Sequence, residues 1–94
     1  MVRVTRMALL WLLMADSKWS PSFGSIQVRL GRSIRATRTS RNMTQETLAA
    51  AVGIGSRHLQ KIEAGEVNVT LSTICRIASV LAVDPGSLLQ ENQK

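Results

Sequence analysis

Hydrogen-bond donors dominate the polar side chains of residues 56–63, a segment whose two apolar side chains are Leu59 and Ile62. The polar members are Ser56, Arg57, His58, Gln60, Lys61 and Glu63. All of them except Glu63 can donate a hydrogen bond. Such donors match the acceptor atoms on the major-groove edge of guanine. The segment therefore predicts contact with nucleic acid, provided that one helix presents these side chains together.

Catalytic and metal-binding patterns are missing from the 94 residues. His58 is the one histidine and Cys75 the one cysteine, so neither a zinc cluster nor an intrachain disulfide can form. No nucleophile–base pair or phosphate-binding loop stands out. We therefore predict no enzyme activity, no metal and no cofactor, and we expect Cys75 to be a small core residue.

The charge is concentrated in the middle of the chain. Seven basic residues and one acid lie in residues 29–61, whereas residues 62–94 carry a net negative charge. The whole chain has a net charge of +6 and a pI of about 11.2. Nucleic acid is the first partner that this charge favours, and an anionic membrane surface is the second.

Helical periodicity predicts an all-α chain, because no strand-like alternation occurs. We expect helices over 27–40, 45–52, 56–64 and 71–82, with a short fifth helix from 84–85 and a linker over 18–26. Helix caps are expected at Thr44, Thr70 and Asp84, and left-handed helix ends at Gly53 and Gly65. The apolar positions predicted to face the core are Leu30, Ile34, Leu48, Ala49, Val52, Leu59, Ile62, Leu71, Ile74, Cys75, Ala78, Leu81, Leu88 and Leu89.

Two short helices joined by a three-residue turn with glycine fit a helix-turn-helix, whose second helix enters the major groove. The run TQETLAAAVG (44–53), followed by IGSRHLQKIEAG (54–65), resembles the Xre family of phage Cro and repressor DNA-binding domains. The segments 34–38 and 71–89 fit the first helix and the ending of that family. The resemblance covers residues 28–90. It implies a five-helix lambda-repressor-like domain over 27–94 that binds double-stranded DNA and regulates transcription, for example as a repressor.

The resemblance also implies roles for individual residues. Ser56, Arg57 and Lys61 stand where the family reads bases, and Gln60 is a fourth candidate. The residues expected near DNA phosphates are Arg41, Thr44, Gln45 and His58. For Arg41 this expectation rests on its position close to Thr44 and Gln45 in the chain, and the residues alone leave His58 simply exposed. Gln45 is also expected to brace the recognition helix, and Arg38 and Glu63 to form a structural ion pair.

The chain departs from the family pattern in three places. Gly55 replaces the Ser or Thr that usually caps the recognition helix, which weakens the cap but leaves its amides open to a phosphate. Thr37 stands where leucine is common, so the first helix packs less apolar surface. Residues 66–69 lack the basic side chains that often contact phosphate, so we expect fewer backbone contacts.

Residues 1–26 form an apolar N-terminal extension and linker. The apolar run at 7–15 is shorter than the roughly 20 residues that cross a bilayer. It has the length of a signal-peptide core, but Leu13-x-Ala15 is a poor cleavage site. Two interpretations stay open: a helix that packs on the domain or on a second subunit, or an extension upstream of a natural start near Met7, Met14 or Val28.

Partners and assembly also leave alternatives. We expect a cytoplasmic homodimer without a small-molecule substrate, whose two recognition helices lie about 34 Å apart on a palindromic operator. Leu88 and Leu89, or residues 7–15, are the candidate dimer contacts. The rival is an antitoxin or restriction-system controller whose main partner is another protein, such as a toxin or RNA polymerase. A membrane-associated protein, held by residues 7–15 and the arginines, is a weaker rival. Arg29 and Arg32 fit either a phosphate contact or a solvated surface.

Overall fold

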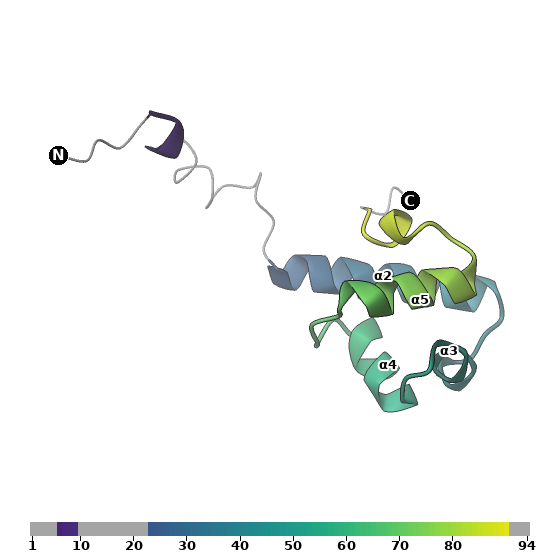
Figure 1. The fold of residues 1–94 in the computed structure, drawn as a ribbon. Coiled ribbons are helices and arrows are strands. Elements are labelled where there is room, and N and C mark those ends of the chain that lie inside the picture. The colour runs from purple at the N-terminus through teal and green to yellow at the C-terminus, as the bar shows by residue number, and fades with distance from the viewer. Residues whose placement is uncertain (1–5, 10–22, 91–94) are drawn as a thin grey trace.

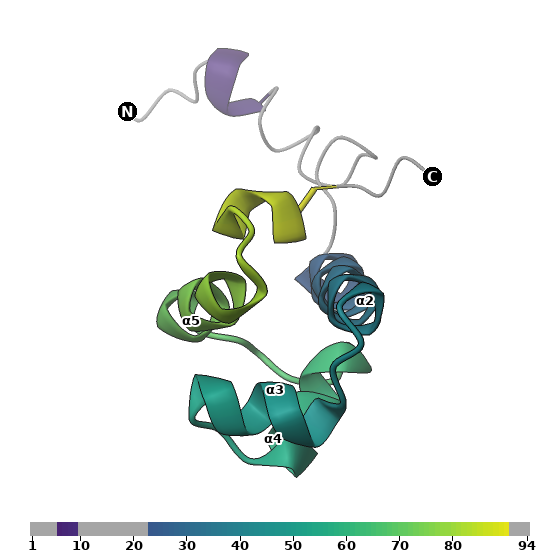
Figure 2. The same cartoon turned by 90° about the vertical axis from the view of Figure 1, so that its right-hand side faces the viewer.

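The computed structural model describes residues 6–9 and 23–90, and the described residues contain helices and no strand. A helical turn at 6–9 precedes α2 (Phe23–Ser40), α3 (Gln45–Val52), α4 (Ser56–Glu63), α5 (Leu71–Leu81) and the 3-10 helix η1 (Pro85–Leu88). The predicted all-α class is thus confirmed. In Figure 2, α2 and α5 lie on either side of the molecule, η1 lies at one end and α3 and α4 at the other.

The first long helix begins earlier than the sequence pattern indicates. We expected it from residue 27, after a linker over 18–26, but α2 already includes 23–26. Once the buried Leu30 and Ile34 anchor a helix, each added turn continues existing hydrogen bonding, and only nucleation is costly. A single Gly24 costs about 1 kcal/mol relative to alanine and does not end the helix. Most of the apolar run at 7–15 and the rest of the linker lie outside the described residues, whereas Met7 and Leu9 are exposed.

The five predicted caps and helix ends are present, whereas the left-handed Ala82 that ends α5, with φ of 59°, is not predicted by the sequence. The hydroxyl of Thr44 accepts from the amide of Thr47, and Thr70 acts likewise on Thr73. The carboxylate of Asp84 accepts from the amide of Gly86 at the start of η1. Gly53 and Gly65 adopt the left-handed conformation with φ of 89° and 76°. Local side-chain chemistry therefore sets the boundaries of the short helices around the turn.

The core draws apolar side chains from every element between α2 and η1. Its buried members are Leu30, Ile34, Leu48, Ala49, Val52, Leu59, Ile62, Ile74, Ile77, Ala78, Leu81 and Leu88. The prediction that Leu88 forms a dimer contact is wrong, because this side chain is 1% exposed and faces the core. Leu89 is half-buried and packs against the same cluster.

Two core predictions on α5 are also wrong. Cys75 is exposed and Leu71 is 75% exposed. Each residue turns a helix by about 100°, so a stripe that runs through Ile74, Ile77 and Leu81 carries Cys75 away from the core. Leu71 lies at the first position of α5, beyond the edge of the packed stripe. These two side chains leave apolar surface at the start of the helix.

Candidate nucleic-acid interface

The turn between α3 and α4 places the two helices at an angle to one another (Figure 1), and the polar side chains Arg57, His58, Gln60 and Lys61 of α4 are exposed. Gly53 ends α3 in the left-handed conformation, and residues 53–55 connect the helices. Leu59 and Ile62 are 0% and 1% exposed and hold α4 against the core. The donors that precede and follow them are therefore displayed on the opposite side.

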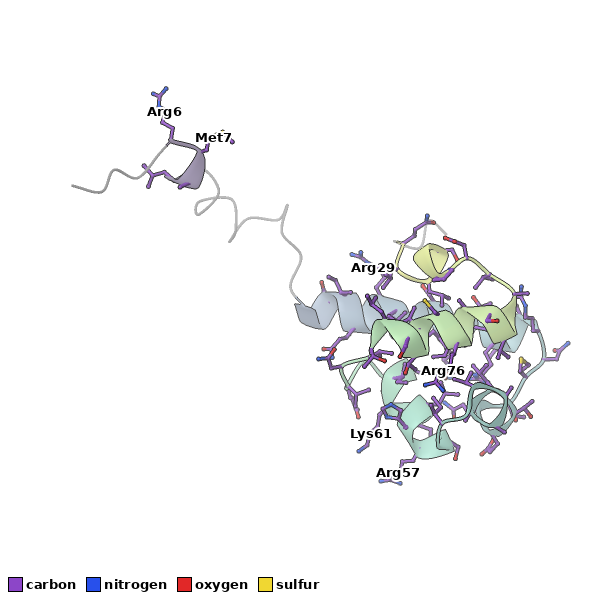
Figure 3. The ribbon with its side chains drawn as sticks, in the orientation of Figure 1. Arg6, Met7, Arg29, Arg57, Lys61 and Arg76 are labelled. Atoms are coloured by element: carbon purple, nitrogen blue, oxygen red, sulfur yellow. The ribbon has the colours of Figure 1, made fainter. Side chains whose placement is uncertain are left out.

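Three of the four expected base-reading side chains lie together on that outer side. Arg57, Gln60 and Lys61 line one open hollow with Ala64 and Glu66. The positions 57, 60, 61 and 64 form a single stripe along a helix. Figure 3 shows Arg57 and Lys61 extending from α4 away from the rest of the domain. Ser56, the first residue of α4, is half-buried and does not line the hollow.

The residues expected near phosphates are arranged less uniformly. Arg41 and His58 are exposed. The Thr44 hydroxyl caps α3 and also donates to Oγ1 of Thr47 at 2.9 Å. Nε2 of Gln45 donates to Oε1 of Glu63 at 2.9 Å. Arg41 and His58 thus extend into solvent, with Nη1 of Arg41 donating to Oγ of Ser40 at 3.4 Å, whereas Thr44 and Gln45 already form hydrogen bonds within the domain.

A buried ion pair joins α2 to the end of α4. Nε of Arg38 donates to Oε2 of Glu63 at 2.7 Å, and Nη2 donates to Oε1 at 3.0 Å. The two side chains are 9% and 3% exposed. Nη1 of Arg38 also donates to the carbonyl of Met43 at 2.7 Å, just before α3. The pair that the resemblance implies is therefore present as a two-pronged contact.

This ion pair and the amide of Gln45 form a three-residue clamp, Arg38–Gln45–Glu63, which connects α2, α3 and α4. The hydrogen bond to Glu63 raises the pKa of Arg38 above its ordinary value. The arginine is therefore fully charged at any pH at which the protein is studied. In the described residues no buried side-chain polar atom is left without a partner. The clamp fixes the angle at which α4 leaves the domain.

Gly31 is a second determinant of that position, and the sequence analysis missed it. A Cβ atom at Gly31 would lie 2.5 Å from the carbonyl oxygens of both Ile62 and Glu63. The backbones of α2 and α4 therefore approach one another more closely than any side chain permits. A glycine within a helical pattern was the available signal, but its partner helix cannot be read from the chain.

Arg76 is another positioning residue that the sequence analysis missed. Its Nη1 atom donates to the carbonyl of Val52 at 3.1 Å, and Nη2 donates to Oγ1 of Thr73 at 3.4 Å. Figure 3 shows Arg76 on α5, pointing toward the end of the molecule that holds α3 and α4. A cation at the C-terminus of α3 satisfies a free carbonyl and complements the helix dipole. Arg76 therefore attaches α5 to the first helix of the turn.

The departures from the family pattern have structural counterparts. Gly55 precedes α4 with φ −70° and ψ 147° and provides no side-chain hydrogen bond to its first turn. The amides at this helix start therefore keep their capacity to bind an anion. Val67 and Val69 of the following loop pack against the core instead of extending toward a phosphate. Arg29 points to the side of α2 that lies away from Arg57 and Lys61 (Figure 3).

Other kinds of site find no support in residues 6–9 and 23–90. None of the helices in these ranges is long and apolar enough to cross a membrane. Within the same ranges, no three side chains of the metal-ligating types come together.

Known proteins share this arrangement. The helix-turn-helix family HTH_3 matches residues 34–88. The control protein C.BamHI of Bacillus amyloliquefaciens is 36% identical over 66 residues, which cover 69% of this chain and 82% of that protein. An uncharacterized transcriptional regulator in the ATPase CF(0) region of Rhodospirillum rubrum is 34% identical over 58 residues, or 62% of this chain. The chain spans only 54% of that regulator, about half its length.

A solved structure shows the same fold. The restriction-modification controller protein C.AhdI from Aeromonas hydrophila matches with a TM-score of 0.66 and 33% sequence identity. The match covers 68% of this chain and 97% of that protein. Sequence pattern, helix geometry and both kinds of relative agree, and the chain belongs to the helix-turn-helix family HTH_3, of the Xre and Cro type.

Proposed function

We propose that this chain binds double-stranded DNA in a sequence-specific manner and regulates transcription. The observation that carries the proposal is the stripe of exposed donors on α4, Arg57, Gln60 and Lys61, which the buried Arg38–Glu63 pair holds in place. A rigidly held helix can present donors to base edges in a fixed register, and such registers underlie sequence reading in the major groove. No covalent chemistry is required for this activity.

The proposed roles divide between bases and phosphates. Arg57 and Lys61 contact the acceptors of guanine, Gln60 contacts an adjacent base, and Ser56 contributes at the start of the helix. Arg41, Thr44, Gln45 and His58 lie along the phosphate backbone. Since Gln45 already contacts Glu63, its phosphate contact and its bracing of α4 would act together. Phosphate contacts set register and base contacts set sequence preference.

The division of roles can be tested by fluorescence anisotropy with a preferred and a scrambled duplex at several salt concentrations. Arg57→Ala should lower affinity for the preferred duplex by about 5- to 150-fold and leave the scrambled duplex nearly unchanged. Arg41→Gln should weaken both duplexes alike and reduce the salt slope by about 0.9. Gln45→Ala should also weaken both. If Arg57→Ala also lowers the affinity for the preferred and the scrambled duplex equally, the division is wrong.

A homodimer is the proposed active form, because two copies would place two α4 helices on successive major grooves. The exposed apolar side chains of Leu71 and Cys75, one turn apart on α5, are surface that a second copy would cover. We propose this surface as the dimer contact in place of Leu88, because Leu88 is buried in the core. Sedimentation equilibrium of the full chain measures the assembly directly.

The restriction-system controller is the second candidate function, and the relatives favour it. C.BamHI is named a control protein and C.AhdI a restriction-modification controller, and this chain covers 82% and 97% of their lengths. In that setting the protein would bind DNA upstream of its own gene and regulate a neighbouring restriction system. Anisotropy with that upstream DNA tests the idea, and affinity equal to that for scrambled DNA would argue against it.

A further inference from the structure

We infer that Glu66 is a further specificity-determining residue, whose carboxylate accepts a hydrogen bond from the exocyclic amino group of a cytosine. The inference rests on the proposed DNA binding and deepens it. It names the base pair, G·C, that the hollow on α4 selects. The resemblance assigns no role to this residue, and the loop that carries it lacks basic side chains.

Backbone geometry places Glu66 beside the recognition stripe although it lies outside the helix. Gly65 adopts a left-handed conformation with φ 76°, which turns the chain back at the end of α4. The amide of Glu66 then donates to the carbonyl of Lys61 at 3.0 Å. As a result, Glu66 lines the same hollow as Arg57, Gln60 and Lys61.

The charge of Glu66 is unpaired in this setting. The one ion pair in residues 6–9 and 23–90 joins Arg38 to Glu63, so the exposed carboxylate of Glu66 forms none despite its basic neighbours. A carboxylate is an acceptor and the arginine and lysine are donors. The hollow therefore offers both kinds of hydrogen-bonding group to an incoming ligand.

A G·C pair has the matching pattern. On the major-groove edge guanine presents two acceptors, N7 and O6, and cytosine presents one donor, the N4 amino group. Arg57 or Lys61 can contact the guanine while Glu66 accepts from the cytosine. The hollow is open to solvent and does not enclose a ligand, so the edge of a base pair can approach its lining side chains.

The experiment is selection of duplexes from a random library by the full chain, followed by anisotropy on the enriched duplex and its single base-pair substitutions. Wild type is compared with Glu66→Ala and Glu66→Gln. Glu46→Gln is the matched control, because Glu46 is exposed on α3 and lies outside the hollow, while the change in charge is the same. Thermal unfolding of each variant checks the fold.

The expected result is a change confined to one position of the motif. Glu66→Ala should lose about a 5- to 150-fold preference for G·C at that position and keep the remaining motif. Glu66→Gln should shift the preference toward adenine, with which glutamine pairs through one donor and one acceptor. Glu46→Gln should leave the motif unchanged.

The outcomes separate the inference from the proposed function. If wild type enriches no motif, sequence-specific binding itself is refuted. If wild type enriches a motif and both Glu66 variants enrich the same one, only the role of Glu66 is refuted. A uniform rise in affinity of the Glu66 variants for every duplex would also overturn it, because the carboxylate would then only repel phosphates.

Discussion

The buried contact between Arg38 and Glu63 makes stability sensitive to one atom. Glu63→Gln exchanges one carboxylate oxygen for an amide nitrogen, a donor, and at least one hydrogen bond from Arg38 or Gln45 loses its acceptor. The guanidinium then remains charged in a side chain that is only 9% exposed. Removing one partner of a buried ion pair costs about 3–5 kcal/mol. We expect a loss of free energy of unfolding in that range.

That loss is large relative to the domain. A folded region of this size has a free energy of unfolding of about 3–10 kcal/mol. Urea unfolding followed by far-ultraviolet circular dichroism measures the change, and with a slope of about 1 kcal/mol per molar the midpoint should fall by about 3–5 M. If the wild-type free energy of unfolding lies near the lower end of this range, Glu63→Gln would be unfolded even without urea. The exposed Glu46→Gln substitution is the control and should change stability by less than about 0.5 kcal/mol.

A double substitution tests the cause. Arg38→Met with Glu63→Leu removes both charges and keeps similar volume, which is typically neutral or stabilising when a buried pair is replaced. We expect the double variant to recover at least about 2 kcal/mol relative to Glu63→Gln. Two results would refute the reasoning: a loss below about 1 kcal/mol in Glu63→Gln, or a double variant no more stable than the single one.

The direction of the pKa shift of Arg38 determines how this contact contributes to stability at different pH values. The hydrogen bond to Glu63 raises the pKa of Arg38. A raised pKa means that the contribution is complete below the ordinary arginine pKa and is lost only as the pH rises through the raised value. From about pH 5 to about pH 9 the charge of Arg38 is therefore constant and contributes no slope to stability. If the urea midpoint changes with pH in this window, the change must come from the titration of groups other than Arg38.

Substitutions at three further positions probe the supports of α4 and the proposed dimer. Gly31→Ala should lower the free energy of unfolding by about 2 kcal/mol or more and weaken binding to all duplexes, because the added methyl group meets the carbonyl of Glu63. Thermal unfolding measures the first effect and anisotropy the second. An unchanged melting temperature would contradict the close approach of α2 and α4. Arg76→Ala should lower stability by about 0.5–1.5 kcal/mol, because an exposed arginine no longer donates to the carbonyl of Val52, and Arg76→Lys should recover only part of this loss. Leu71→Glu should leave the monomer folded and raise the dimer dissociation constant at least about 10-fold in sedimentation equilibrium, whereas an unchanged constant would place the interface elsewhere.

Local chemistry accounts for the parts of the fold that the sequence predicts. Thr44 and Thr70 begin helices because their hydroxyls satisfy amides three residues ahead, and Gly53 ends one because it tolerates a positive φ. These effects depend on neighbours in the chain and can be read without the fold. The apolar stripes of α3 and α4 follow from helical periodicity in the same way.

Contacts between distant residues account for what the sequence analysis missed. Gly31 allows two helices to approach closely only because α4 packs there, and the contact residue Ile62 lies 31 residues later in the chain. Arg76 shows no pattern of its own, since its partner is a carbonyl of α3. The periodicity of α5 predicts an apolar stripe but not its width, so the pattern predicts a buried Cys75, which the structure shows to be exposed. The grouping of Glu66 with α4 depends on the turn at Gly65.

The missing side chain at Gly31 has a consequence for how this protein can diverge. The separation of α2 and α4 is set there by backbone against backbone, and not by interchangeable core side chains. Substitutions among the core residues therefore leave the distance between α2 and α4 at this point unchanged. The outward residues Arg57, Gln60 and Lys61 belong to no core contact and are exposed. Under the proposed function, substitutions at these exposed positions change which DNA sequence is recognised and leave the core intact, so a lineage can acquire new targets one residue at a time.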